Sequence, residues 1–343
     1  MNKKNKLLIV GDLHLRDNLS YFGHIADGRV AEKKEILDFI VESSKDCTDI
    51  VFMGDNFHSR NNSSETNREF VELLERLDNK EIYVLVGNHE KKGDGKTAID
   101  FLKEVKHSNW HIFTKPHNAQ IGNLKVSFLP YMLKSELGTE NDEQATEKIM
   151  RELPGGDILF AHHSISDTTF NGLSTNTLKE VVLPKADLEK KYKQVIAGHI
   201  HAPGVFGNTI LTGSVFNAEI GETEKFIWKI DEILKVEQIK LPGRGIYKVI
   251  DPTPNLLSQI PKESIVKVTI TDKKINIEEI KDGLTRFDAS LILEQYPDER
   301  KKMHDMEKNG ALDFSPESLL KLYSEERGID LGKLLKGFEL INK

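Results

Sequence analysis

The chain has 343 residues, of which 30% are charged and 38% are hydrophobic, and its formal net charge is −7. This composition is ordinary for a globular protein, and the length predicts two domains or one large domain with an appendage. With a pI near 6.0 the chain has no overall attraction for nucleic acid, so a DNA-binding surface would have to be a local patch or one completed by a partner.

Two further features narrow the class of protein. The single cysteine, Cys47, excludes a disulfide framework or a thiolate metal cage formed within the chain. The basic start MNKKNK is followed by an apolar run too short for a signal-peptide core, and no stretch approaches the ~18 apolar residues of a membrane span. We therefore expect a cytoplasmic protein with no membrane contact.

Short apolar, β-branched runs recur through the first part of the chain and predict strands buried on both faces. These runs are Leu7–Val10, Ile50–Met53, Ile82–Val86, Ile158–Ala161 and Val195–Ala197. Helical patterns lie between them at Val30–Ser44, Asn67–Leu77, Thr97–Val105 and Asp142–Leu153. Strands that alternate with helices predict an α/β fold with crossover connections. A hairpin is expected at Gln120–Leu129, and further strands at Ile210–Gly213, Phe226–Ile230 and Val236–Leu241.

The pattern changes after about residue 240, which predicts a first domain of residues 1–240. A small α+β unit is expected over 241–300, with strands Ile246–Ile250, Ile265–Thr271 and Ala289–Leu293 and a helix Ile277–Leu284. Residues 301–343 predict a linker and a helical tail. One tail helix begins near Ser315 and ends near Gly328, and a second carries an apolar stripe from Leu331 to Ile341.

Five small polar motifs follow the five buried strand candidates directly. They are Asp12-Leu13-His14, Gly54-Asp55, Gly87-Asn88-His89-Glu90, His162-His163 and Gly198-His199-Ile200-His201. In an α/β sheet, ligands bind beyond the carboxyl ends of the strands, so these distant segments would deliver their side chains to one edge. We therefore expect them to form a single site.

The residue types in these motifs favour divalent metal ions. Carboxylate, amide oxygen and neutral imidazole are ligands for Mn²⁺, Fe²⁺ or Zn²⁺. In an extended chain, Asp12 and His14 would point to one side, as would His199 and His201. The motifs supply seven candidate ligands, which are too many for one ion and suit two ions that share a carboxylate. Such a pair of ions can activate a water and bind the oxygens of a phosphoryl group. The motifs therefore predict two-metal phosphoester chemistry.

These motifs resemble the calcineurin-like metallophosphoesterase superfamily over roughly residues 7–230. The resemblance implies a four-layer α/β/β/α sandwich with a dinuclear site at one sheet edge. It implies that one ion is held by Asp12, His14, Asp55 and His201, and the other by Asp55, Asn88, His162 and His199. It gives His89 a different role, which is to protonate the leaving oxygen or stabilise charge beside the phosphate. His163 is the alternative to His162 as the ligand.

Gly54-Asp55-Asn56-Phe57-His58 is similar to the corresponding motif of SbcD-type DNA nucleases, subunits of bacterial and phage double-strand-break complexes. That likeness implies Mn²⁺-dependent exonuclease and endonuclease activity in DNA repair and recombination, with His58 helping to place the DNA backbone. It also implies a homodimer, a DNA-binding role for the 241–300 cap, and an SbcC-type ATPase partner bound by the C-terminal helices. Arg16, Arg60 and Lys91 follow ligand motifs and are candidate phosphate contacts.

Other functions remain open at this point. A small-substrate or cyclic-nucleotide phosphodiesterase or phosphatase of the same superfamily is the main alternative, although it has no obvious need for the C-terminal hundred residues. A Ser/Thr protein phosphatase is disfavoured because Gly-Asp-x-x-Asp-Arg-Gly does not follow Gly54-Asp55. A catalytically silent scaffold is disfavoured because no ligand position is lost. Glu90 departs from the SbcD-type pattern, which more often has Asp there.

Overall fold

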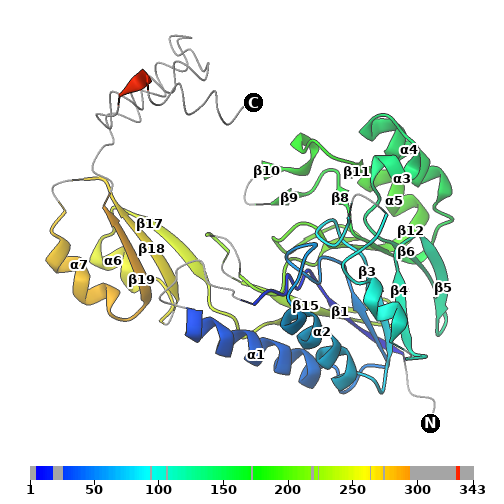
Figure 1. Ribbon diagram of the computed structural model, residues 1–343, viewed down its shortest axis with the longest axis horizontal. Helices are drawn as coiled ribbons and strands as arrows, with labels where there is room; N and C mark the ends of the chain where they lie inside the picture. Colours follow the sequence, from blue (N-terminus) through cyan, green and yellow to red (C-terminus); the bar gives the residue numbers. More distant parts are fainter. Residues whose placement is uncertain are drawn as a thin grey trace.

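A computed structural model describes residues 5–17, 26–92, 95–105, 107–170, 173–217, 220–222, 224–262, 264–272, 275–293 and 330–332. Two six-stranded sheets stack on each other with helices on both outer faces, and a separate three-stranded sheet follows them in the chain (Figure 1). The predicted α/β/β/α sandwich is therefore confirmed.

The first sheet has the strand order β16-β15-β1-β2-β3-β4. Its strands are β1 (Lys6–Val10), β2 (Asp49–Phe52), β3 (Glu81–Leu85), β4 (Trp110–Phe113), β15 (Phe226–Asp231) and β16 (Val236–Lys240). Strands β1 to β4 are parallel, because helices α1 (Ala26–Ser43) and α2 (Ser64–Arg76) return the chain to the same end of the sheet. Strands β15 and β16 extend the other edge in antiparallel fashion.

The second sheet has the order β13-β14-β12-β7-β6-β5. Its strands are β5 (His117–Ile121), β6 (Leu124–Leu129), β7 (Gly156–Ala161), β12 (Tyr192–Ala197), β13 (Gly204–Phe206) and β14 (Thr209–Leu211). The predicted hairpin is present as β5–β6, and Gly122 at its turn has a φ of +57°. Its outer helices are α3 (Lys134–Leu137), α4 (Asp142–Glu152) and α5 (Lys185–Lys191).

Three apolar layers hold the sandwich together. Ile9 and Val51 of the first sheet meet Phe128 and Phe160 of the second in the layer between the sheets. The layer under α1 and α2 contains Leu8, Phe52 and Phe70, and the layer under α4 and α5 contains Leu159, Val195 and Leu188. Strand residues alternate between the two sides, which explains why the strands appear in the sequence as continuous apolar runs.

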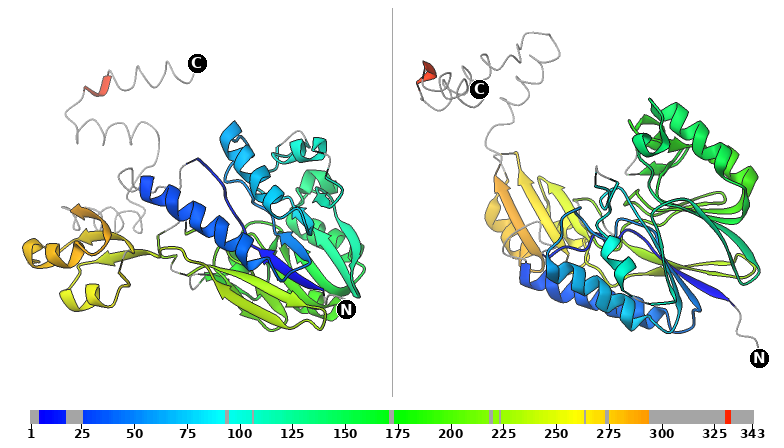
Figure 2. Two further views of the ribbon diagram at one scale, coloured as in Figure 1. Left: turned by 90° about the horizontal axis from the view of Figure 1, so that it is seen from below. Right: turned by 45° about the vertical axis from the view of Figure 1, so that its right-hand side comes forward.

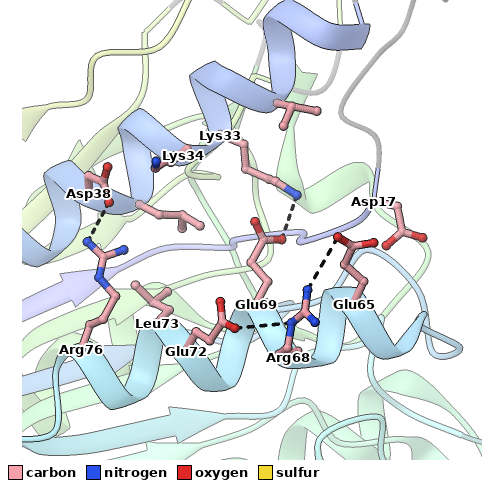
Figure 3. Close-up of a pocket in the computed structure, with 12 residues that line it drawn as sticks. Asp17, Lys33, Lys34, Asp38, Glu65, Arg68, Glu69, Glu72, Leu73 and Arg76 are labelled. Carbon is pink, nitrogen blue, oxygen red and sulfur yellow. Dashed lines mark hydrogen bonds and ion pairs between the residues drawn. The ribbon is translucent and has the colours of Figure 1, made fainter.

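Helices α1 and α2 lie side by side and enclose a surface cavity of about 430 Å³. Its charged walls are paired across the two helices, with Lys33 Nζ 2.8 Å from Glu69 and Arg76 Nη2 2.7 Å from Asp38 (Figure 3). The cavity is therefore explained by helix packing.

A short-stranded excursion between β7 and α5 has no counterpart in the sequence prediction. It contains β8 (Ser164–Ile165), β9 (Thr169–Phe170), β10 (Leu173–Ser174), the 3₁₀ turn η3 (Thr175–Thr177) and β11 (Val182–Leu183). Strand β8 pairs with β11 in parallel, with Ser164 opposite Val182. The last strand of the excursion, β11, therefore pairs with its first strand, β8, just after β7.

The C-terminal unit lies beside one end of α1, apart from the sandwich (Figures 1 and 2). Strands β17 (Ile246–Ile250), β18 (Ile265–Ile270) and β19 (Asp288–Leu293) are parallel, and α6 (Pro254–Ser258) and α7 (Ile277–Leu284) connect them. At the junction, Arg244 binds Glu32 of α1 through its backbone N and its Nε, each at 3.0 Å. The predicted tail helices lie outside the described residues except at Asp330–Gly332.

Some elements differ from the prediction. The segment expected to be helical at Thr97–Val105 forms a 3₁₀ helix, η2 (Asp100–Glu104). The five apolar runs also do not share one sheet, because β1, β2 and β3 lie in the first and β7 and β12 in the second. Among the described helices, none is both long and apolar enough to cross a bilayer.

Candidate metal centre

The five polar motifs meet where strands of both sheets end. Among the described residues, three sets of side chains bring their ligand atoms within 4.8 Å of one another. One set joins His14 to His58 and His89. The other two, which we call the first and the second group, are Asp12, His14 and His201, and Asp55, His162 and His199. Both groups combine the carboxyl ends of β1 or β2 with the carboxyl ends of β7 or β12. The two sheets therefore supply each group jointly.

The first group is centred on two imidazoles. The Nε2 atoms of His14 and His201 are 2.8 Å apart, and Asp55 Oδ2 is 3.8 Å from His14 Nε2. Asp12 is fully buried, and its carboxylate accepts hydrogen bonds from the backbone N of His199 at 3.0 and 3.2 Å. Two nitrogen ligands and one or two carboxylates converge here, which suits a divalent ion.

The second group is centred on Asn88. Its Oδ1 atom is 3.2 Å from His162 Nε2 and 2.8 Å from His199 Nδ1. Asp55 Oδ2 is 3.4 Å from His162 Nε2, so the same oxygen atom lies near a histidine of each group. This is the position that a bridging carboxylate needs.

The hydrogen bonds of His162 show that a cation fits between these atoms. Its Nδ1 is 2.8 Å from the carbonyl oxygen of Met53, which can only accept, so Nδ1 carries a proton. The lone pair of neutral Nε2 would then face two oxygen acceptors, Asn88 Oδ1 and Asp55 Oδ2. Burial lowers the pKa of His162, but the carboxylates of Asp55 and Asp12 outweigh burial and raise the pKa to about 10. A metal ion would take the place of that extra proton.

Three of the ligands have left-handed backbone conformations. The φ values are +47° at His14, +45° at Asp55 and +82° at His199. Such conformations cost about 1–3 kcal/mol each for residues with a side chain and gather at functional sites. Asp12 and His14 reach the same group, as expected, although the backbone at His14 is not extended. The expected alternation is wrong at His199 and His201. His199 turns into the second group, whereas His201 joins the first.

Two glycines allow the ligand loops to approach each other. A Cβ atom on Gly54, whose φ is +104°, would lie 2.4 Å from His162 Nδ1, and one on Gly87 would lie 2.1 Å from Asp55 Oδ1. Both contacts are far shorter than normal packing distances. The missing side chain at Gly54 therefore lets the loops of the two sheets meet, and the missing side chain at Gly87 lets the loop after β3 approach Asp55.

Glu90 is a site residue whose role the sequence did not reveal. Its fully buried carboxylate accepts hydrogen bonds from the backbone N of Asp55 at 3.1 Å, Phe57 at 3.0 Å and Gly87 at 2.6 Å. Burial, together with the charge of Asp55, raises the pKa of Glu90 to about 8. Glu90 thus links the loop after β2 to the loop after β3, and it departs from the SbcD-type pattern without disturbing the ligands.

The structure separates the two adjacent histidines. His162 points into the second group, whereas His163 Nε2 accepts a hydrogen bond from the backbone N of Met132 at 3.2 Å. The His163 ring stacks on Tyr131 with centroids 5.1 Å apart. Burial lowers the pKa of His163 to about 3, which keeps it neutral. His163 therefore lies outside both ligand groups.

His89 and His58 lie at the open margin of the site. The backbone N of His89 donates to Asp55 Oδ1 at 2.8 Å, and its ring Nδ1 donates to the carbonyl oxygen of His58 at 2.7 Å. His89 Nε2 is 3.9 Å from Asp55 Oδ2, and 36% of its side chain is exposed. His58 is exposed, and its Nε2 is 3.1 Å from Arg16 Nη1. Burial and the Arg16 charge lower the pKa of His58.

The candidate phosphate contacts have different surroundings. Arg60 is exposed, and Arg16 lies beside His58. Lys91, in contrast, has only 4% of its side chain exposed, and its Nζ is 2.8 and 2.9 Å from the carboxylate oxygens of Glu136. Its ammonium group is thus already paired inside the protein, and Lys91 would have to leave Glu136 to contact a phosphate.

Comparison with known proteins agrees with this geometry. No curated protein matches the chain significantly. Among solved structures, an archaeal phosphodiesterase is similar at 14% sequence identity with a TM-score of 0.35, over 69% of this chain and 99% of that one. The sequence profile of the calcineurin-like phosphoesterases matches residues 6–203, which is more than half of the chain and includes all the predicted ligands. The chain therefore belongs to the calcineurin-like phosphoesterase family of metal-dependent hydrolases.

Proposed function

We propose that the protein is a Mn²⁺-dependent DNA nuclease of the SbcD type that hydrolyses phosphodiester bonds. The observation that carries this proposal is the open margin of the site, where the His58 imidazole and the Arg16 guanidinium lie beside His89. An exposed cationic and histidine-rich margin suits a polymeric phosphodiester, which must enter from the side. It adds to the likeness of the Gly54–His58 motif to SbcD-type nucleases.

Two groups of residues would hold the metal pair. We assign Asp12, His14, Asp55 and His201 to one ion and Asp55, Asn88, His162 and His199 to the other. When bound, the pair supplies an activated water and stabilises charge on the phosphoryl oxygens. Carboxylate, amide and imidazole ligands are compatible with Mn²⁺.

His89 would act on the substrate and would not bind metal. Its Nδ1 proton is committed to the His58 carbonyl, 2.7 Å away, which leaves Nε2 as the atom available to substrate. A protonated Nε2 would donate to the leaving oxygen, and the His58 carbonyl would hold the ring at the required angle. His58 thereby contributes through its backbone as well as its side chain.

Arg16, Arg60 and His58 would contact the DNA backbone. Phosphate contacts fix the position of the duplex and carry no sequence information, as expected of a nuclease with little sequence preference. The net charge of −7 makes such a local cluster necessary, because the protein as a whole does not attract DNA.

The proposed assignment to a repair and recombination complex extends to the C-terminal part of the chain. We propose residues 1–240 as the nuclease domain, 241–300 as a DNA-binding cap, and 301–343 as the segment that binds an SbcC-type ATPase, in a homodimeric assembly. Deletion of residues 315–343 should leave nuclease activity of the isolated chain intact and abolish co-purification with the ATPase. Unchanged co-purification would refute the tail assignment.

The decisive experiment offers two substrates in parallel to the purified full chain with Mn²⁺. Linear double-stranded DNA should be cleaved, and the Asp55→Ala variant, which lacks the bridging carboxylate, should be inactive. A small bis-aryl phosphodiester reports on metal chemistry without requiring DNA binding. Cleavage of the small ester with intact DNA would instead favour a small-substrate or cyclic-nucleotide phosphodiesterase. Loss of neither activity in the Asp55→Ala variant would reveal a contaminating enzyme.

A further inference from the structure

A carboxylate from outside the five motifs contacts one of the ligands. Glu180 lies in the excursion between β7 and α5, just before β11. Its Oε1 and Oε2 atoms are 2.9 and 3.0 Å from His199 Nε2. Both side chains are largely shielded from water, since 23% of the Glu180 side chain and 13% of the His199 side chain are exposed. A contact this close and this shielded is stronger than an ordinary surface ion pair.

The contact determines which nitrogen of His199 carries the proton. A carboxylate accepts, so His199 Nε2 must donate to Glu180. The other ring nitrogen, Nδ1, is then free of a proton and faces Asn88 Oδ1 at 2.8 Å, inside the second ligand group. Glu180 therefore selects the tautomer that a metal ligand requires.

Glu180 is itself held in place. The Ser164 hydroxyl donates to Glu180 Oε1 at 2.5 Å, and Ser164 is fully buried on β8. The parallel pairing of β8 with β11 places Ser164 opposite Val182, two residues beyond Glu180. The excursion that follows His162 and His163 in the chain thus also supplies the carboxylate that contacts His199.

The other ligand histidines have weaker or different second contacts. His162 Nδ1 donates to a backbone carbonyl, that of Met53, which is uncharged. His201 Nδ1 lies 3.6 Å from Glu222 Oε1, and that oxygen also accepts from Lys225 Nζ at 2.8 Å. Among the ligand histidines, His199 has the closest carboxylate, at 2.9 Å, and its φ is +82°.

We propose that Glu180 is a positioning residue, which orients the His199 ring and increases its affinity for the ion of the second group. This inference rests on the metal centre and not on the nuclease assignment. Carboxylate partners of ligand histidines fix the ring and raise its basicity, and their loss weakens metal binding by roughly 10–100-fold. Glu180 acts through His199 and does not contact the reacting atoms.

The test is a calorimetric titration of the metal-free full chain with Mn²⁺ alone. We expect two sites in the wild type. In Glu180→Ala one site should weaken by roughly 10–100-fold while the other is unchanged. In Glu180→Gln the affinity of that site should lie between the affinities in the wild type and in Glu180→Ala. The glutamine amide oxygen can still accept from His199 Nε2, and the Ser164 hydroxyl can rotate to accept from the amide nitrogen. Glu152→Gln removes the same charge from an exposed position on α4 and should match the wild type.

Three outcomes would overturn the proposal. Equal affinities for Mn²⁺ in Glu180→Ala and wild type would show that the contact between Glu180 and His199 does not contribute to metal binding. Glu180→Gln no better than Glu180→Ala would indicate that the carboxylate binds the ion directly. Weakening of both sites together with a lower unfolding temperature in EDTA would indicate a structural role only. Nitrogen-detected NMR of the metal-free protein adds a direct readout, since the fraction of neutral His199 that is protonated at Nε2 should fall in Glu180→Ala. A wild type that binds no metal pair would instead contradict the metal centre itself.

Discussion

Replacing Gly54 with alanine tests whether the ligand loops depend on the absence of a side chain. Gly54 has a φ of +104°, and a Cβ there would lie 2.4 Å from His162 Nδ1. The backbone conformation would cost about 1–3 kcal/mol, and relief of the overlap would cost about another 1–3 kcal/mol. Because normal contacts lie near 3.5 Å, the His162 ring would have to move by about 1 Å. We therefore expect Gly54→Ala to lose about 2–6 kcal/mol of unfolding free energy and to bind the second ion more weakly.

Gly221→Ala is the matched control. Gly221 has a φ of +101°, and no atom of the described residues lies within 4 Å of the position of its Cβ. It should therefore show the backbone cost of about 1–3 kcal/mol without the overlap. Urea unfolding in EDTA, followed through the buried Trp110 and Trp228, gives the stability of each variant, and metal titration gives the affinity. If Gly54→Ala matches Gly221→Ala in both, the inferred clash with His162 does not exist.

Three other outcomes follow from the site. The pKa of Glu90 is raised from the ordinary 4.5 to about 8, and that of His162 from 6.5 to about 10. The stability that each group contributes is therefore complete below its ordinary pKa. It is lost as the pH rises through 8 for Glu90 and towards 10 for His162. In EDTA, the unfolding temperature measured by calorimetry should therefore fall between pH 7 and 9, and with metal bound it should fall less. The same dependence on pH in both conditions would contradict this. His89→Ala should lower turnover by about 10²–10⁴-fold while elemental analysis still finds two ions, and loss of metal would make it a ligand. Arg60→Ala should weaken DNA binding and reduce its salt dependence, whereas Lys91→Ala should leave the salt dependence unchanged because its ammonium is paired with Glu136.

The fold was largely predictable because buried parallel strands leave a strong sequence signal. Runs such as Leu7–Val10 and Ile158–Ala161 are apolar on both faces, and each became a central strand, β1 or β7. The sequence signal was too weak to predict strands at the sheet edges and short strands within loops. Strand β4 contains Trp110 and His111 and is only partly buried, so it lacks a continuous apolar run. The two-residue strands β8 to β11 are too short to show a period.

The predicted ligands came together because each follows a strand directly, a position the sequence displays. The residues that support them follow no such rule. Glu90 resembles any polar residue after a turn until its three backbone donors are seen, and those donors depend on the loop after β2. Glu180 reaches His199 only through the pairing of β8 with β11. The ion pair of Lys91 could not be predicted for a similar reason, because its partner Glu136 is distant in the sequence.

The distribution of the candidate ligands over two sheets has a structural consequence for metal binding. Each group takes ligands from both sheets, so an ion bound to either group would link the two sheets at their carboxyl ends. The apolar layer between the sheets contains Val51 of β2 and Phe160 of β7, and these strands lead to Asp55 and His162. Ion binding and packing of this layer should consequently stabilise each other, since a ligand that binds only the folded state raises its stability by about 2.7 kcal/mol at a hundred times its Kd. The left-handed conformations at His14, Asp55 and His199 oppose this gain. The metal-free sandwich therefore depends on its inter-sheet core to hold strained ligand loops in place before any ion arrives.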